Sequence, residues 1–512
     1  MYKILLCLRY LRTRYIALIC IVSVTLGVAT MIVVNSVMAG FTHEMQAHMR
    51  GATGDIVFRA RSLDGVPDAE EHIAKIRDLL GSSVAGISPL VEVPALMYFE
   101  TSGGTQTRQI MLVGIDKASY SGVSNFGEYL QHPANRQQLS FELRDGGYDV
   151  YDHQVEDPTE LKPRIQMQGA GWAYRRSVAL AKQRRQIYEA NLLKQNKVES
   201  PSRTLDPFAA QAAANEEVGE RDFNAFTEQH TGIVLGLGIC SYRNLDGSET
   251  FQALPGSDVR VSFPTATLPA QISNGFYTIT DFYESKMGEL DASYAFVPLR
   301  QLQASRGMID PTTGVGNFTS IRIKLKPTFD ASVARDLLRN EFPSGMYAIS
   351  TWKDQQHPIL QAVQVETLVL NVLLFMIVAV AGFGILAIFY MIVVEKTRDI
   401  GILKSLGASS HGVMGIFLGY GLSLGVVGSG VGLALGLQFQ KNINAIAHFL
   451  SRMTGQDFFD PSVYFLPEIP TRVDPITVTW ICLGAILIAV LASVMPALRA
   501  ARLDPVRALR YE

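Results

Sequence analysis

Four long apolar runs without a charged residue most constrain how this 512-residue chain can fold. They are Ile16–Met38, Leu368–Val394, Val413–Leu437 and Ile476–Leu498. Each run has 23 to 27 residues, and a helix of that length measures about 35–40 Å, enough for a hydrocarbon core of about 30 Å. Only 18% of all residues are charged, below the roughly 25% of soluble domains. The sequence therefore predicts an α-helical membrane protein with four transmembrane helices and excludes a plain soluble enzyme.

Basic residues near the ends of these runs predict the orientation of the chain. The N-terminus, the loop after the second run and the C-terminal tail are each rich in Lys and Arg, which favours the cytoplasmic side. Four crossings place all three segments on that side together. The predicted segments are 1–15 (cytoplasmic N-terminus), 16–38 (transmembrane helix 1), 39–367 (extracytoplasmic domain), 368–394 (transmembrane helix 2), 395–412 (cytoplasmic helix), 413–437 (transmembrane helix 3), 438–475 (outer loop), 476–498 (transmembrane helix 4) and 499–512 (cytoplasmic tail).

Residues 39–367 mix strand and helix patterns, which predicts a large α+β domain inserted between transmembrane helices 1 and 2. Only one of the four cysteines, Cys240, lies in this segment, so an intramolecular disulfide is impossible there and apolar burial must stabilise the domain. The expected strands are Ile56–Arg59, Ala95–Glu100, Gln109–Gly114, Val259–Phe263 and Ala295–Pro298, and the expected helices are Asp68–Leu80, Leu299–Arg306 and Ala331–Phe342.

The stretch from about 139 to 231 differs from its surroundings because polar tracts replace strand patterns. Lys162–Lys197 carries nine basic residues and one acidic residue, Glu189, and Ala173–Lys197 favours a helix. This composition is typical of a solvated helical insertion. A contact with anionic lipid headgroups or another acidic partner is a second hypothesis. Pro201–Asp222 is predicted to be a flexible linker.

The chemistry that is missing from the sequence limits the function. The apolar runs contain Asn35, Asn371 and Tyr420 but no Asp, Glu, Lys, Arg or His, the groups that ion-coupled transporters place at mid-membrane. The sequence has no P-loop and no metal-ligand spacing, and a net charge of −2 gives no reason to expect nucleic acid as a partner. Gly421–Gly425 matches a nucleophile elbow but lies inside an apolar run. We expect no catalytic residue, metal or cofactor in this chain, and catalysis or sensing by the outer domain is a less favoured alternative.

Glycines are concentrated in the third run. Small residues spaced four apart let helix backbones approach closely, so we expect this helix to pack tightly. The partner is either another helix of the same chain or a second subunit. The predicted packing residues are Gly421, Gly425, Gly428, Gly432 and Gly436.

The segment between the second and third runs has the pattern of a short amphipathic helix. Ile400, Leu403 and Leu406 recur every three residues beside charged residues, and Gly407 can end the helix. The pattern fits equally an interfacial helix or a docking helix for a cytoplasmic partner.

The residues Glu395–Ala408 resemble the coupling-helix signature of FtsX/MacB-type ABC transporter permeases, and the similarity extends furthest to the lipoprotein-releasing (Lol-type) permease family. Further segments are similar to the family's first helix and its exit, to part of its periplasmic domain and to its C-terminus. These segments are Leu8–Arg12, Ser36–Phe41, Gly51–Thr53, Ser285–Val297 and Pro496–Arg510. Lys286 and Gly288 depart from the pattern, since the lipoprotein-releasing branch more often has Gly and an aromatic residue there.

The resemblance implies a multi-pass protein of the bacterial inner membrane with both termini in the cytoplasm and a periplasmic domain. It implies two copies of a cytoplasmic ABC ATPase that bind ATP and Mg, and a second permease copy or paralogue. Lipoprotein cargo, a periplasmic carrier and membrane lipid are the other expected partners. The family's function is to couple ATP hydrolysis to the release of lipoproteins from the inner membrane.

The resemblance also assigns roles to particular residues. The expected ATPase-coupling residues are Glu395, Lys396, Arg398, Ile400, Leu403 and Lys404, with Gly401 and Gly407 shaping the turn and helix. Met287, Glu289 and Asp291 belong to the periplasmic family motif. An alternative is a mechanotransmission complex that regulates an extracytoplasmic cell-wall enzyme, with the insertion at 139–231 as its docking site, and export of another amphiphile is a further alternative.

Overall fold

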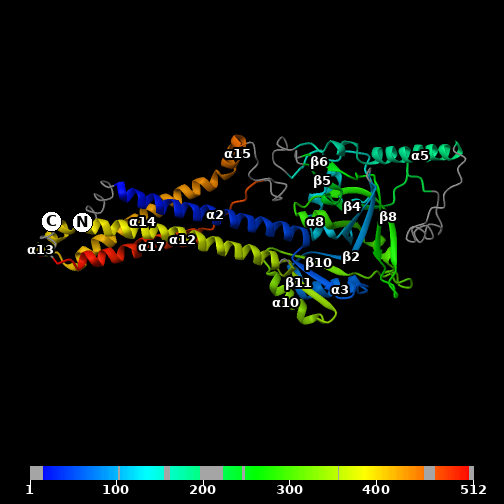
Figure 1. Ribbon diagram of the computed structural model, residues 1–512. Helices are drawn as coiled ribbons and strands as arrows, with labels where there is room; N and C mark the ends of the chain where they lie inside the picture. Colours follow the sequence, from blue (N-terminus) through cyan, green and yellow to red (C-terminus); the bar gives the residue numbers. More distant parts are fainter. Residues whose placement is uncertain are drawn as a thin grey trace. The chain divides into compact units, whose positions relative to one another are not determined.

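The chain forms two compact units in a computed structural model (Figure 1). Unit 1 comprises Met1–Gln46 and His357–Glu512, and unit 2 comprises Ala47–Gln356. The structure describes residues 15–101, 104–154, 162–195, 223–244, 248–355, 357–454, 468–504 and 506. The predicted linker Pro201–Asp222, most of the N-terminal segment 1–15 and the end of the tail lie outside these residues.

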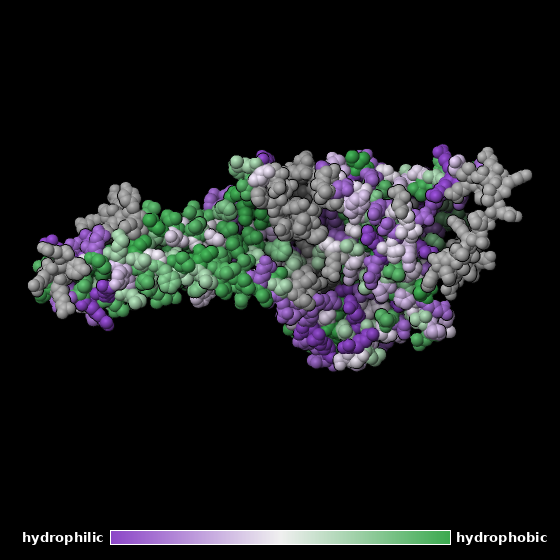
Figure 2. Space-filling model, in the orientation of Figure 1, coloured by the Kyte–Doolittle hydropathy of each residue, from purple (hydrophilic) through white to green (hydrophobic). Residues whose placement is uncertain are grey.

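Unit 1 is built from long apolar helices and shorter amphipathic ones. The long helices are α2 (Tyr15–Thr53), whose end extends into unit 2, α12 (His357–Glu395), α14 (Ser410–Lys441) and α17 (Pro475–Ala501). The shorter helices are α13 (Thr397–Ser405) and α15 (Ile443–Thr454). Four stretches are long and apolar enough to cross a membrane: Leu18–Ala47, Leu360–Glu395, Ser410–Lys441 and Pro475–Ala501. Hydrophobic residues predominate along the visible face of the long helices in Figure 2. The prediction of four membrane-crossing helices is confirmed in the length and composition of these helices. The helices α2, α12 and α14 continue beyond their apolar runs.

The glycines of α14 bring it close to two neighbouring helices. Gly428, Gly432 and Gly436 face α2, whereas Gly421 and Gly425 face α17. A Cβ atom at these positions would lie between 2.5 and 3.2 Å from an atom of the neighbouring helix. Larger side chains would push the helices apart, because apolar lipid provides no hydrophobic force to hold them together. All five predicted packing glycines therefore contact helices of their own chain.

Unit 2 contains a nine-stranded sheet in the order β11-β1-β10-β2-β3-β9-β4-β8-β7. Its strands are β1 (Ile56–Ala60), β2 (Val84–Thr101), β3 (Gly104–Ile115), β4 (Thr231–Gly236), β7 (Asp258–Pro264), β8 (Ile272–Tyr283), β9 (Tyr294–Pro298), β10 (Ser320–Leu325) and β11 (Tyr347–Thr351). The pairs β3–β9 and β4–β8 are parallel, and the others are antiparallel. A separate two-stranded sheet joins β5 (Ser241–Arg243) to β6 (Glu249–Phe251).

Strand β2 closes part of this sheet into a ring. It pairs with β3 along most of its length and also with β7 at Leu96–Tyr98. The strands β2, β3, β9, β4, β8 and β7 therefore form a closed barrel, and closure removes exposed strand edges. Alternate β2 residues from Val91 to Phe99 fill the barrel core, as the two-residue period of a strand requires.

Unit 2 also contains helices and 3-10 turns. The helices are α3 (Ala69–Leu80), α4 (Pro133–Gln137), α5 (Trp172–Gln195), α7 (Leu237–Cys240), α8 (Gly288–Ser293), α9 (Leu299–Arg306), α10 (Ala331–Glu341) and α11 (Trp352–Gln355), and the 3-10 turns are η1 (Gly81–Ser83), η2 (Tyr120–Gly122), η3 (Phe126–Tyr129) and η5 (Ile165–Gly169). A second core joins α3 and α10 to β1, β10 and β11 through residues such as Phe58, Ile76 and Leu338.

The α+β class predicted for the outer domain is confirmed. The expected strands lie within β1, β2, β3, β7 and β9, and the expected helices coincide with α3, α9 and α10. Strands β4, β8, β10 and β11 were not predicted. Their pairing partners lie far away in the sequence, and β-propensity depends strongly on that context.

The stretch at 139–231 is not solvated throughout. Among its described residues before β4 there is no strand, and the helix α5 corresponds to the expected one. However, Leu143, Tyr148 and Met167 are buried, and Tyr148 and Met167 belong to the barrel core. The exposed part begins at Leu180, since every α5 residue whose exposure is described from there on is exposed. The first part of the stretch is thus a structural part of unit 2.

The close contacts of α14 predict a difference between two of its glycines. A Cβ at Gly432 would lie 2.8 Å from the Thr25 carbonyl oxygen, whereas a Cβ at Gly430 would meet nothing within 4 Å. Gly432→Ala should therefore destabilise unit 1 by about 1–3 kcal/mol through overpacking. Gly430→Ala should be neutral or slightly stabilising, because Ala has the higher helix propensity. Thermal unfolding of the two variants in mild detergent measures the difference, and equal melting temperatures would contradict this packing.

Candidate functional site

The helix α13 lies between α12 and α14 in the chain and is attached to the end of α17. Lys404 Nζ donates hydrogen bonds to the carbonyl oxygens of Ala501 at 2.8 Å and Leu503 at 2.7 Å. Carbonyls at a helix C-terminus favour a cation because they lack intrahelical donors and carry the negative end of the helix dipole. Ile400 is 4% exposed and packs in the apolar core of unit 1. One side of α13 is therefore fixed to the bundle.

The opposite side of α13 carries large apolar side chains that are exposed. Ile402 is 43% exposed, Leu403 is 40% exposed and Leu406 is 80% exposed; we call these three residues the α13 patch. Arg398 and Glu395 are also exposed. Exposed apolar side chains rimmed by charges are typical of a contact with another protein.

The residues predicted to couple this chain to an ATPase do not all lie on the same side of α13. Ile400, Gly401 and Lys404 face the bundle, and Lys396 Nζ donates to Asp399 at 2.8 Å. Arg398 and Leu403 are exposed, and Gly407 adopts a φ of 94°, which favours glycine after a helix. Ile402 and Leu406 were not among the predicted coupling residues. Their signal was the i, i+4 spacing between them, together with the i, i+3 spacing from Leu403 to Leu406.

A cavity of about 710 Å³ lies within unit 1 between α2, α12 and the segment leading into α17. Asn35 and Asn371, two of the polar residues noted inside the apolar runs, line it. Arg472 and Asp474 contribute charged groups to the same wall. The cavity wall therefore combines these polar and charged groups with apolar side chains of the helices. Unit 2 contains a separate groove of about 1150 Å³.

The motif Ser285–Val297 contains a buried carboxyl group, that of Asp291. Asp291 Oδ1 accepts hydrogen bonds from the Ser285 amide and hydroxyl, both at 2.8 Å. Burial raises the pKa of Asp291 to about 7. Met287 precedes α8, and its carbonyl accepts from the Asp291 amide. The Glu289 side chain lies outside the described part of the structure, so among the three predicted motif residues the described side-chain hydrogen bonds belong to Asp291.

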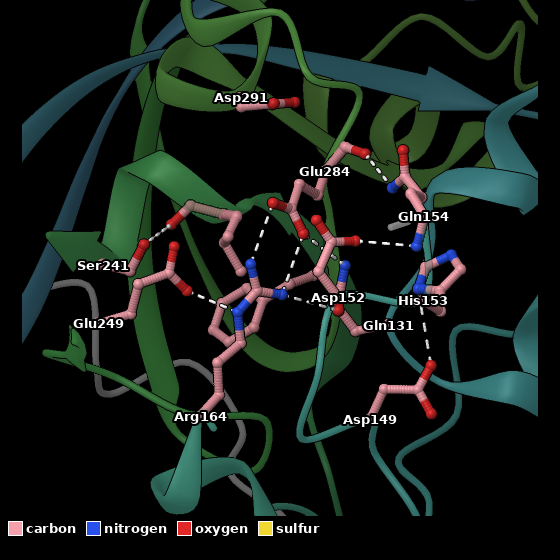
Figure 3. Close-up of polar contacts among 12 residues, drawn as sticks. Gln131, Asp149, Asp152, His153, Gln154, Arg164, Ser241, Glu249, Glu284 and Asp291 are labelled. Carbon is pink, nitrogen blue, oxygen red and sulfur yellow. Dashed lines mark hydrogen bonds and ion pairs between the residues drawn. The ribbon is translucent and has the colours of Figure 1, made fainter. Parts of the chain in front are cut away.

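A buried group of charges lies next to this motif (Figure 3). Arg164 Nη1 and Nη2 donate to the two carboxylate oxygens of Glu284 at 2.9 and 3.0 Å. Arg164 Nε donates to Glu249 at 2.5 Å, and Nη1 also donates to Gln131 at 3.0 Å. Arg164 comes from the stretch at 139–231, whereas Glu284 follows β8 directly. This network therefore ties that stretch to the barrel.

Lys286 adds a second cation to the same network. Its Nζ donates to Asp152 and, at 3.1 Å, to Glu284. Its φ of 62° lies in the left-handed region, which costs a residue other than glycine roughly 1–2 kcal/mol. The lysine at this glycine-type position is paired with Asp152, which belongs to the stretch at 139–231. The backbone conformation of Lys286 and that stretch are therefore parts of one structural feature.

Asp281, on β8, is a buried carboxyl group that the sequence did not reveal. It is 0% exposed and accepts from Asn135 Nδ2 at 2.7 Å and from the His132 amide at 3.3 Å. Burial raises the pKa of Asp281 from 3.8 to about 7. The hydrogen bonds to this carboxyl group attach the segment around η3 and α4 to β8.

Lys286 predicts a measurable coupling with Asp152. Lys286→Met keeps the strained backbone and leaves Asp152 buried without its partner, which should cost about 3–5 kcal/mol. Combining Lys286→Gly with Asp152→Asn should recover most of that loss. Lys182→Met is the matched control, because the exposed Lys182–Glu100 pair at 3.7 Å should contribute less than about 1 kcal/mol. Urea unfolding of the full chain in mild detergent gives these energies, and a double variant no more stable than Lys286→Met would argue against the pair.

Asp281 predicts a pH dependence of stability. Its folded pKa lies above its unfolded pKa, so its stabilising contribution is full below 3.8 and is lost as the pH rises to about 7. Relative to Asp281→Asn, the wild-type chain should lose stability over this interval. Chemical unfolding of both proteins at several pH values tests the slope. A stability difference that is independent of pH would contradict the raised pKa.

Comparison with known proteins agrees with the sequence motifs. Residues 371–505 match the FtsX-like permease C-terminal family. The lipoprotein-releasing system transmembrane protein LolC of Xylella fastidiosa is 31% identical over 281 residues, which are 55% of this chain and 65% of the relative. LolE of Haemophilus influenzae is 27% identical over 295 residues, 57% of this chain and 67% of the relative.

A more distant match extends the comparison beyond the lipoprotein-releasing proteins. The uncharacterized ABC transporter permease YknZ of Bacillus subtilis is 26% identical over 227 residues, 43% of this chain and 50% of the relative. The chain spans at most about two thirds of the length of these relatives. The predicted resemblance is confirmed: residues 371–505 match the FtsX-like permease C-terminal family, and the chain is similar to ABC transporter permeases of the lipoprotein-releasing type.

Proposed function

We propose that this chain is the non-catalytic permease subunit of an ABC complex in a bacterial inner membrane, and that the complex releases lipoproteins from that membrane. The observation that carries the proposal is the FtsX-like domain at 371–505, which contains the exposed α13 patch. The similarity to LolC and LolE supports the choice of lipoproteins as cargo. A separate ATPase, present in two copies, binds ATP and Mg.

The basic residues around the apolar runs support the orientation of the proposed complex. Both termini and α13 lie in the cytoplasm, and unit 2 is the periplasmic domain inserted between the first and second transmembrane helices. A second permease copy or a paralogue completes the membrane part, and a periplasmic carrier accepts the cargo. The α13 patch is then on the side where the ATPase is found.

The contacts of α13 support a route for mechanical coupling. An ATPase docked on the α13 patch can move α13. Because Ile400 and Lys404 hold the other side of α13 to the bundle, this movement is transmitted to the bundle. Lys404 bonds directly to the end of α17. The α17 helix in turn contacts α14 at Gly421 and Gly425. ATP-driven movement in the cytoplasm can therefore reach the membrane helices without charged groups inside them.

The exposed half of α5 supports a second candidate function. Lys182, Arg184 and Arg185 lie on this half, which projects as an exposed basic helix from unit 2. An acidic enzyme of the cell wall could dock there and be regulated by mechanotransmission. Replacing these three residues with Ser should then abolish activation of that enzyme, and unchanged activation would remove the support for this candidate.

The α13 patch gives a direct test of ATPase docking. Leu403→Asp with Leu406→Asp should abolish co-purification of the ATPase, because each apolar side chain buried in a contact contributes about 1.5–3 kcal/mol. Ser405→Asp is the control for introducing a carboxylate, since it adds one negative charge to an exposed position of α13 outside the patch. Ile400→Asp is unsuitable as a probe because Ile400 is buried in the bundle. Retention of the ATPase by a stably folded double variant would refute the docking role.

The cargo is tested by mass spectrometry of the complex purified through a tag on this chain. A P-loop ATPase together with acylated proteins is the result expected for lipoprotein release. The ATPase together with a cell-wall enzyme, and no lipidated protein, would favour mechanotransmission instead.

A further inference from the structure

The helix α15 has one apolar and one polar side. Its sequence places Ile443, Ile446, Ala447, Leu450 and Met453 along one side, with Phe449 at the edge, at the spacing of an amphipathic helix. Its other side carries Asn444, His448, Ser451 and Arg452. None of its residues is buried. Phe449 is 62% exposed, Leu450 is 41% exposed and Met453 is 71% exposed.

The polar side of α15 is bound to the rest of unit 1. Asn444 Nδ2 donates to Glu468 Oε2 at 2.7 Å, and Asn444 Oδ1 accepts from the Ile469 amide at 3.1 Å. We call Glu468–Asp474 the strap, because it continues over α2 and leads into α17. The polar side of α15 therefore holds the strap, and the apolar side is left for another contact.

The strap itself is closely fitted to α2. The Arg472 amide donates to the Ser36 carbonyl at 2.9 Å. A Cβ at Gly40 would lie 2.3 Å from the Pro470 carbonyl oxygen, so only glycine allows the chains to approach this closely. Gln440, at the end of α14, donates to Thr471 at 2.7 Å. The position of α15 is thus fixed relative to three membrane helices.

The depth of α15 in the membrane follows from the length of α14, the helix to which it is joined. With 32 residues, α14 is about 48 Å long, and a bilayer with its headgroups is about 40–45 Å thick. Only Asn442 separates α14 from α15. Trp480, near the start of α17 at the same end of the bundle, is 70% exposed, and tryptophan is enriched at membrane interfaces. The apolar side of α15 therefore continues the lipid-facing surface of α14 at headgroup level.

We propose that α15 is an interfacial helix whose side formed by Phe449, Leu450 and Met453 inserts into the boundary between lipid headgroups and acyl chains. Arg452 and His448, on the other side, remain in contact with water. This assignment holds for either orientation of the chain and is independent of the cargo. Its consequence is mechanical, because the strap held by α15 supplies Arg472, Val473 and Asp474 to the wall of the 710 Å³ cavity. The bilayer surface thereby fixes one wall of that cavity.

The test places a tryptophan reporter on each side of α15 in the full chain. Phe449→Trp and His448→Trp are made separately in a Trp480→Phe background and reconstituted into lipid nanodiscs that contain brominated phosphatidylcholine. For the expected depth of about 5–10 Å, bromine near the headgroup should quench the Phe449→Trp emission several-fold more than the His448→Trp emission. Bromine at the chain ends should quench it less. The signal of the Trp480→Phe parent is subtracted from both.

The other outcomes overturn the proposal. Equal quenching of both reporters would mean that the amphipathic sides do not orient α15 in the lipid. A blue-shifted Phe449→Trp emission without quenching would place protein, such as a second copy of this chain, on the apolar side. The melting temperature of each variant is compared with that of the parent, and Met453→Trp replaces Phe449→Trp if the latter fails to fold.

Discussion

Backbone polar groups inside a bilayer must be satisfied within the chain, and this constraint determines the architecture of unit 1. Helices meet it locally, so four long helices form wherever the sequence is apolar for long enough. Their association then depends on close contact, because lipid tails are as apolar as the side chains. The glycines of α14 supply that contact toward α2 on one side and α17 on the other. α14 is therefore the central packing element of the helical unit.

The helix bundle positions a different contact surface at each of its two ends. At one end, Lys404 fastens α13 to the terminal carbonyls of α17 and leaves the α13 patch exposed. At the other end, the strap joins α15 to α2 and contributes one wall of the 710 Å³ cavity. A protein partner at the first end and the membrane surface at the second would both act on the same set of packed helices. Coupling through the membrane then requires no titratable group in the apolar core.

In unit 2, the long polar stretch at 139–231 must be held against an apolar barrel. Buried ion pairs perform this role: Arg164 joins Glu284 and Glu249, and Lys286 joins Asp152. A buried pair is weak evidence for net stability, but loss of one partner is costly because the other charge stays buried. The positive φ of Lys286 and the stretch at 139–231 are therefore best understood together.

The sequence by itself determined the four membrane helices, because length and the absence of charge suffice to predict a span. It also predicted the α+β class, the short helix between the second and third spans, and the resemblance to FtsX-like permeases. These are local patterns or short motifs that need no knowledge of distant contacts. Only the tertiary structure decided which side of α13 is exposed, separating Ile400 from Leu403 and Leu406.

Tertiary structure likewise decided the barrel closure and the buried charges. β2 meets β7 and Lys286 meets Asp152 across more than a hundred residues of sequence, so no local period could reveal either contact. The need for Gly40 is of the same kind, because it arises from the Pro470 carbonyl on a distant segment. Hydropathy and helical period act over a few turns of chain, whereas ion pairs, close backbone contacts and strand partners exist only once distant segments meet.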